Sequence, residues 1–176
     1  MTHATIYKSG DADFNEAMAT FVGRTAAQRF FVARYGADSD ELKAAMDRYD
    51  DEAVIDDFVV RLFTDAKAYY EAAAARGDDR ETIIAGRDAV FDASVASFAS
   101  DYEPKLKKPD DWTRLRSLKI NNAIILGGVR YQAGLSDFAD VLAAAGDDFP
   151  IALQVFSDAA KAADSRSYLR QWAMEH

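Results

Sequence analysis

Apolar side chains recur at helical spacing along residues 52–76, and no other feature of the sequence limits the fold as strongly. The stripe consists of Val54, Ile55, Phe58, Val59, Leu62, Phe63, Ala66, Tyr69 and Tyr70. This spacing is typical of an amphipathic helix of more than four turns. The chain holds only three prolines and nine glycines, and we find no convincing strand pattern. The sequence therefore predicts an all-α fold, a multi-helix bundle of antiparallel helix pairs with about seven to eight helices.

Capping patterns and turn residues divide the chain into helices. Asp13 with Glu16 three positions later is a form of the capping box, and it predicts the start of the first helix. The break at 77–79 is short, so the helices on either side should form an antiparallel pair. The segment 103–111 contains two prolines and three lysines and is expected to be a solvated loop. The expected helices span 13–34, 39–49, 52–76, 80–101, 112–118, 121–131, 137–145, 149–163 and 165–174.

Length and composition predict one globular domain. A chain of 176 residues with 49% hydrophobic and 29% charged residues can bury a sizeable core. We therefore expect a single helical domain over 1–176. Residues 1–12 are expected to form an irregular or disordered lead-in to the first helix.

The charge balance and the absence of cysteine narrow the function classes. A net charge of −9 argues against nucleic-acid partners and against binding to an anionic membrane surface. The chain has no cysteine, which excludes a disulfide scaffold and a Cys-based zinc module. No apolar run is long enough to span a bilayer, and no signal peptide is visible, which means little if the chain is a fragment. Its localisation is left open.

A histidine and an acid near the amino end form the first candidate site. His3, one of two histidines, lies a short loop ahead of Asn15 and Glu16, which fall at the start of a helix. An imidazole and a carboxylate brought together across a turn are two of the ligands that a protein zinc site needs. The alternative is structural: His3 is a terminal residue, and Glu16 favours the helix dipole in a first turn.

The second candidate region is the helix expected over 121–131. Either Asn121 or Asn122 can be its N-cap, and the other could hold a neighbouring segment or face a cleft. Tyr131 near its end is either an amphipathic helix-end residue or a phenol that donates to a developing oxyanion. Gly127 and Gly128 lower the intrinsic stability of this helix by about 1 kcal/mol each, which suggests a close backbone approach by another element.

Other enzyme signatures are absent from the sequence. It has no G-x-S-x-G motif, phosphate-binding glycine loop, dinucleotide fingerprint or EF-hand loop. The two histidines stand at opposite ends of the chain, which leaves little from which to build a hydrolase triad. The acidic pairs at 50–51, 56–57 and 78–79 are interpreted as solvated faces and helix starts.

The segment from His3 to Gly23 resembles a bacterial family of zinc aminopeptidases of the gluzincin type. In that family a His-Glu-x-x-His helix precedes a short loop and a Phe-Asn-Glu-x-x-Ala-Thr-Phe-Val segment. This chain has Phe14-Asn15-Glu16-Ala17-Met18-Ala19-Thr20-Phe21-Val22, and Thr2-His3 is similar to the end of the metal motif. The resemblance extends to Asn121-Asn122-Ala123, Tyr131 and the region 138–149, and so covers most of the chain.

The resemblance implies a set of roles. His3 and Glu16 would be zinc ligands, and Asn15 would support them from outside the coordination sphere. Tyr131 would polarise the carbonyl of a peptide substrate, and Asn121 or Asn122 would line the cleft. In the complete protein, zinc-activated water would attack that carbonyl.

The sequence also departs from the family pattern. The first histidine and the general-base glutamate of the metal motif have no counterpart here, whereas a catalytic zinc needs three protein ligands and an open position. We therefore expect a C-terminal helical part of a metallopeptidase that by itself holds zinc weakly or not at all. The alternative is a non-enzymatic helical domain that acts by protein contact and forms a homo-oligomer.

Overall fold

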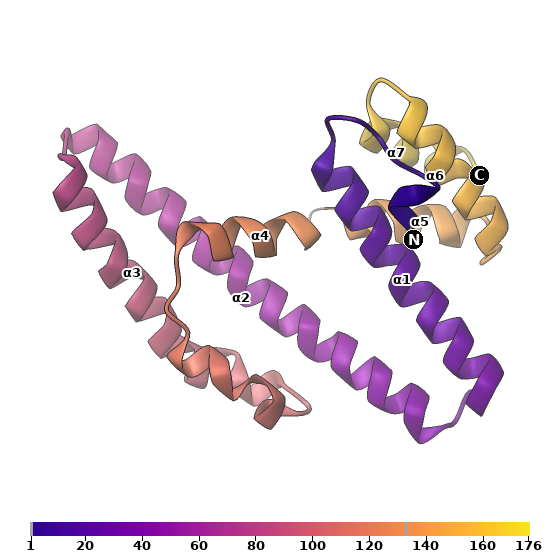
Figure 1. Cartoon of the computed structure of the whole chain (residues 1–176), viewed down its shortest axis with the longest axis horizontal. Coiled ribbons are helices and arrows are strands. Elements are labelled where there is room, and N and C mark those ends of the chain that lie inside the picture. Colours follow the sequence, from indigo (N-terminus) through magenta and orange to yellow (C-terminus); the bar gives the residue numbers. More distant parts are fainter. Residues whose placement is uncertain (1, 133) are drawn as a thin grey trace. The chain divides into compact units, whose positions relative to one another are not determined.

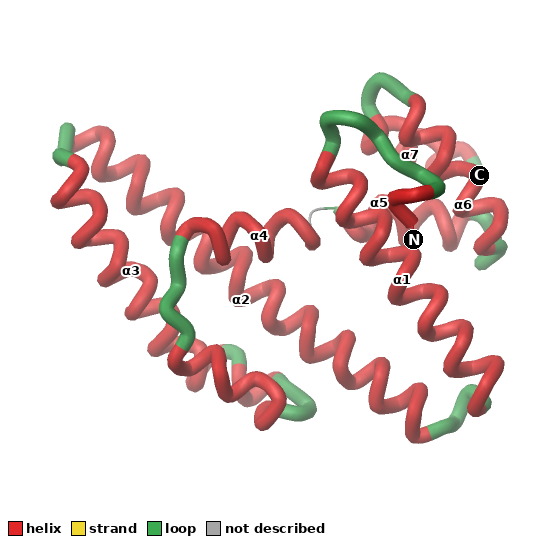
Figure 2. The backbone as a smooth tube through the Cα atoms, in the orientation of Figure 1, coloured by secondary structure: helices red, strands yellow, loops and turns green. Residues whose placement is uncertain are grey.

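The structure is a computed structural model that describes residues 2–132 and 134–176. Over these residues the chain is helical, without strands, and this confirms the all-α prediction (Figure 2). The 3₁₀ helices are η1 (Thr2–Ala4), η2 (Glu103–Lys105) and η3 (Pro109–Ser117). The α-helices are α1 (Ala12–Tyr35), α2 (Asp40–Arg76), α3 (Arg80–Asp101), α4 (Asn122–Gln132), α5 (Leu135–Ala144), α6 (Phe149–Lys161) and α7 (Ser165–Glu175). None of these helices has the length and apolarity that crossing a membrane requires.

The chain divides into two compact units. The first unit combines Met1–Arg34 with Arg130–His176, and the second unit is Tyr35–Val129. Each unit has its own cluster of buried apolar side chains. The expectation of a single domain over 1–176 stays a prediction.

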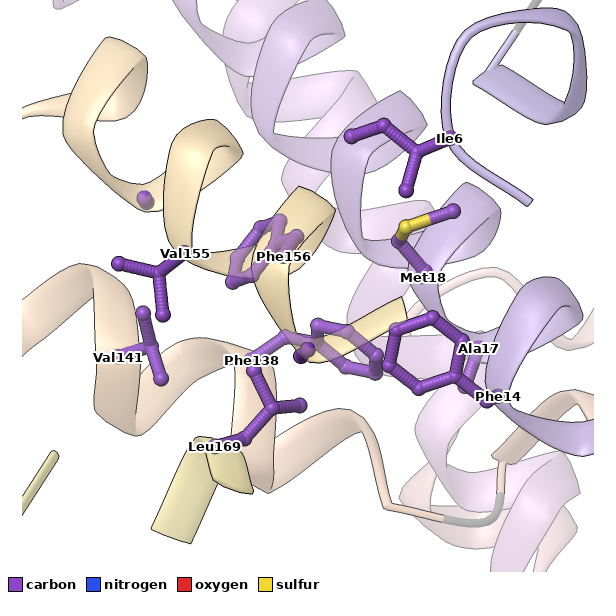
Figure 3. Close-up of a cluster of buried hydrophobic side chains, with 11 residues drawn as sticks. Ile6, Phe14, Ala17, Met18, Phe138, Val141, Val155, Phe156 and Leu169 are labelled. Carbon is purple, nitrogen blue, oxygen red and sulfur yellow. The ribbon is translucent and has the colours of Figure 1, made fainter. Parts of the chain in front are cut away.

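The core of the first unit contains three buried phenylalanines, one each from α1, α5 and α6, among aliphatic side chains (Figure 3). Phe14 and Phe138 are fully buried with ring centroids 5.5 Å apart, and Phe156 meets Phe138 edge-on at 5.0 Å. Such tilted and edge-to-face pairs are the arrangements that aromatic rings prefer. Leu169 of α7 completes this core, so that helices distant in sequence are held together by one apolar cluster.

An ion-pair network joins α5 to α7 at the edge of the first core. The buried carboxylate of Asp137 accepts a hydrogen bond from Arg170 Nε at 2.9 Å and lies 3.4 Å from Arg166. Arg166 also donates to the carbonyl of Gly134 at 2.6 Å. Because both arginines reach the same carboxylate, its buried charge is compensated.

The second unit is organised by α2 and α3, which run antiparallel side by side (Figure 1). Gly77 ends α2 in the left-handed conformation with φ 75°, which glycine adopts without a side-chain clash. Asp79 then caps α3 by accepting from the backbone N–H of Thr82 at 2.8 Å. The break predicted at 77–79 and the helix predicted over 80–101 are both confirmed.

The two helices expected over 39–49 and 52–76 are one continuous helix, so this prediction was wrong. The acidic pair Asp50-Asp51 does not interrupt α2. Asp51 is 1% exposed, and its carboxylate accepts from the backbone N–H groups of Lys107 and Lys108 at 2.6 and 3.0 Å. Because these partners lie on another segment, the side chain does not compete for the backbone of its own helix.

The segment 103–111 is not the solvated loop that was expected. It contains η2 and the start of η3, and Leu106 is buried in the second core. The carboxylate of Asp51 and the ion pair from Lys107 to Asp50, at 2.6 Å, fasten it to α2. Its prolines and lysines are therefore compatible with an ordered connection.

The first helix, expected over 13–34, is present as α1, but its predicted capping residue was wrong. The cap is Asp11, whose carboxylate accepts from the backbone N–H of Phe14 at 3.0 Å, whereas Asp13 lies inside the first turn. Asp11 follows Gly10, whose φ of 82° turns the chain into the helix. Further along α1, Phe30 is 58% exposed.

Candidate functional site

The lead-in before α1 is fastened to that helix by Asn15. This side chain is 2% exposed, and its amide makes two reciprocal hydrogen bonds with the backbone of Lys8. The amide oxygen accepts from the Lys8 N–H at 2.9 Å, and the amide nitrogen donates to the Lys8 carbonyl at 2.8 Å. Ile6, two residues earlier, packs into the first core. The segment that follows His3 is therefore held against the helix that carries Glu16.

Lys8 extends this attachment to the far end of the chain. Its ammonium donates to the carbonyl of Ala162, at the C-terminus of α6, and lies 3.3 Å from the carbonyl of Ala163. A cation at a helix C-terminus satisfies carbonyls that have no partner within the helix and favours the helix dipole. The lead-in thus bridges two helices of the first unit.

The structure describes the side chain of one of the two predicted metal ligands, Glu16. Glu16 is half-buried in the second turn of α1. The backbone of His3 lies in η1, but its side chain lies outside the described residues. Whether an imidazole and a carboxylate meet here stays a prediction. Among the side chains that the structure describes, no group of three or more His, Cys, Asp or Glu could hold a metal ion.

The two asparagines at the start of α4 have different tasks. Asn121 is the N-cap, because its side chain accepts from the backbone N–H of Ile124 at 3.1 Å. Asn122 reaches α2, where its amide oxygen and nitrogen lie 3.0 and 2.9 Å from the hydroxyl of Tyr70. The sequence left open which asparagine would be the cap. Asn122, the one that is not the cap, lines a pocket.

That pocket lies between α2 and α4 in the second unit and has a volume of about 270 Å³. Its walls are mostly apolar, with Asn122 and Tyr70 as a hydrogen-bonding pair at its edge. The lining residues are Phe63, Ala66, Lys67, Tyr70, Glu71, Asn122, Ile125 and Leu126. Concave apolar sites with a few polar groups are typical of ligand binding.

Sequence reasoning missed Tyr70 and Ala66 as pocket residues, because both read as members of an ordinary apolar stripe. Their partners on α4 are about fifty residues away, so no local signal distinguishes a stripe that faces a pocket from one that faces the core. The small side chain of Ala66 between larger neighbours was the one available hint.

The glycine pair in α4 acts through one of its members. A Cβ on Gly128 would lie 2.7 Å from Cγ1 of Val59 on α2, whereas a Cβ on Gly127 would meet nothing within 4 Å. The close backbone approach expected from the sequence is thus confirmed at Gly128. Tyr131 lies in the last turn of the same helix, but its side chain lies outside the described residues.

Comparison with known proteins identifies the family. A family model described as "Putative aminopeptidase" matches residues 1–170, nearly the whole chain. The chain belongs to this aminopeptidase family. No curated protein and no solved structure matches it. The match includes His3, the Asn15-Glu16 pair, the Asn121-Asn122 pair and Tyr131.

Proposed function

We propose that this chain is the C-terminal helical part of a zinc-dependent aminopeptidase. The family match over residues 1–170 supports aminopeptidase membership. Within the first unit, the hydrogen bonds between Asn15 and Lys8 carry the proposal further, because they hold the segment after His3 against the helix of Glu16. In this proposal His3 and Glu16 are zinc ligands, and Asn15 fixes the segments that carry them.

The residues present do not by themselves fit a catalytic zinc. Such an ion needs three protein ligands and an open position, and the chain offers His3 and Glu16. These two side chains alone would not hold a zinc ion in the geometry that water activation requires. The missing histidine and general-base glutamate are proposed to lie upstream of Met1, and a reading frame without an in-frame His-Glu there would remove the basis for this part.

The remaining assignments concern the peptide substrate. Tyr131 is proposed as the hydroxyl that donates to the carbonyl oxygen of the scissile peptide. Asn122 is the better candidate for substrate binding, because its amide lines the pocket between α2 and α4. The sequence also proposed Asn121 as a residue of the cleft, but its side chain is the N-cap of α4.

Zinc titration by isothermal calorimetry tests the metal ligands. We expect no tight binding to the 176-residue chain and tight binding to a form extended upstream in its reading frame. In the extended form, His3→Ala and Glu16→Ala should each abolish tight binding. The matched controls are His176→Ala and Glu81→Ala, which should leave it unchanged. If the extended form binds no zinc, the metallopeptidase assignment fails and a non-enzymatic helical domain takes its place.

A further inference from the structure

The pocket between α2 and α4 is formed by two facing helical stripes with a small residue at the centre of one. Phe63, Ala66 and Tyr70 follow one another along the pocket face of α2, and Ile125 and Leu126 of α4 lie opposite. Ala66 is 5% exposed. Its methyl group is smaller than the rings of Phe63 and Tyr70 about one turn to either side, and all three line the pocket.

Polar groups of several kinds stand around this apolar space. The amide of Asn122 and the hydroxyl of Tyr70 form one pair. The ammonium of Lys67 and the carboxylate of Glu71 form the other, at 3.8 Å, with both side chains more than 60% exposed. An exposed ion pair of this length is held weakly, so either charge can turn toward a ligand.

We propose that this pocket binds a single amino acid with an apolar side chain and with its α-ammonium and α-carboxylate groups both free. The apolar walls receive the side chain, Glu71 receives the ammonium group, and Lys67 receives the carboxylate. The volume of about 270 Å³ lies just below the range of about 300–1,000 Å³ typical of drug-sized ligands. A ligand the size of one amino acid therefore fits better than a longer peptide.

A free amino acid is also the chemical class that an aminopeptidase releases. The inference rests on the proposed function in one respect, the aminopeptidase activity: it places the amino acid that such an enzyme releases in the pocket that Asn122 lines. It requires no metal, so its test is separate from the zinc titration.

The test is a titration of the ¹⁵N-labelled full chain with L-leucine, followed by ¹H–¹⁵N NMR. We expect saturable shifts that centre on Ala66, Tyr70, Asn122 and Leu126. L-Lysine, whose side chain ends in a charge, should bind at least about tenfold more weakly, because burying that charge in an apolar pocket is costly. Leucinamide and N-acetyl-leucine, which each lack one of the two charges, should also bind at least about tenfold more weakly.

Matched variants locate the ligand. Leu126→Ala removes a pocket wall and should weaken leucine binding about tenfold, whereas Ile124→Ala, another exposed apolar residue of α4 outside the pocket, should not. Lys67→Gln and Glu71→Gln should each weaken it, with Glu175→Gln of α7 as the neutralisation control. Ala66→Leu fills the space and should abolish binding while the spectrum keeps its dispersion.

Two results would overturn the proposal. Equal binding of leucine and leucinamide would exclude the carboxylate contact and indicate a peptide N-terminus as the occupant. Shifts that survive Ala66→Leu, or that spread over α3 and α7 instead of the pocket, would show that leucine does not bind there. Neither result bears on the zinc titration of the extended chain, which tests the proposed function separately.

Discussion

At the residue scale, Asn15 and Asp51 perform the same physical task in separate parts of the chain. Each is a buried polar side chain that pairs with two backbone groups of a segment outside its own helix. Backbone groups buried without a partner are costly, so a segment without a regular ladder needs such side chains. Asn15 thereby positions the lead-in before α1, and Asp51 positions the connection 103–111.

Replacing Asn15 should therefore destabilise the protein. Asn15→Ala leaves the N–H and carbonyl of Lys8 without their partners, and we expect a loss of about 1–3 kcal/mol in the free energy of unfolding. Urea unfolding followed by circular dichroism measures it. Gln154→Ala is the matched control, because that exposed amide donates to Asp158 on its own helix. Equal stabilities for the two variants would show that the attachment of the lead-in contributes nothing.

The adjacent acids Asp50 and Asp51 allow a similar comparison. Asp51→Asn replaces one acceptor oxygen by a donor that faces the N–H groups of Lys107 and Lys108, and should cost about 1–3 kcal/mol. Asp50→Asn removes an exposed ion pair with Lys107 and should cost less than about 1 kcal/mol. The same urea experiment measures both. A larger loss for Asp50→Asn would contradict the account of α2 given above.

At the scale of elements, the contact of α4 with α2 depends on which glycine faces the neighbouring helix. Gly128→Ala places a methyl group against Val59 and should lower the melting temperature. Gly127→Ala meets open space and should stabilise the helix by up to about 1 kcal/mol. Thermal unfolding measures both changes. Adding Val59→Ala should restore part of the stability lost in Gly128→Ala and should not change the effect of Gly127→Ala. The reverse pattern would show that Gly127, and not Gly128, faces α2.

The connection 103–111 is also held to α2 by charge. Lys43 and Lys107 both donate to the carboxylate of Asp47. The hydrogen bond from Lys43, and to a lesser extent the one from Lys107, holds the pKa of that carboxyl below its ordinary value of 3.8. Because the folded pKa is the lower one, folding favours the ionised form. The resulting stability is present above pH 3.8 and is lost as the pH falls through the folded pKa. Two further acids lie nearby: Asp50 pairs with the ammonium of the same Lys107 at 2.6 Å, and Asp51 accepts from its backbone N–H.

Asp47→Asn should therefore flatten the decline of stability below about pH 4. Urea midpoints measured from pH 7 to pH 2.5 test this directly. Lys43→Gln, which removes the first partner of the Asp47 carboxylate and keeps the acid, should flatten the acid limb in the same direction. Parallel curves for Asp47→Asn and the unmodified chain would rule out a contribution from this carboxylate.

At the scale of the whole molecule, the presence of two cores has a measurable consequence. Phe138→Ala removes a ring from the first core and should cost about 3–5 kcal/mol. We expect amide hydrogen exchange to accelerate in α5, α6, α7 and the first half of α1, and to remain slow in α2 and α3. Phe98→Ala, in the second core, is the matched variant and should show the opposite pattern. Faster exchange throughout the chain in both variants would show that it unfolds as one domain.

The sequence by itself determined most of the helical residues and where several helices begin and end. The stripe over residues 52–76 and the break at 77–79 are local patterns, because helix periodicity and capping act within a few residues. The family resemblance was likewise visible in short segments, and the match over residues 1–170 confirms its aminopeptidase part. The zinc ligands His3 and Glu16 stay a prediction from that resemblance.

Only the tertiary structure decided how polar residues are used. Asp51 looked like a solvated helix start, and it is a buried acceptor because its partners lie 56 and 57 positions away. Tyr70 and Asn122 are 52 positions apart, so neither indicates a pocket in its own sequence context. A side chain's neighbours along the chain set its helix, whereas its burial and partners depend on which distant segment packs against it, and that is settled only when the whole core forms.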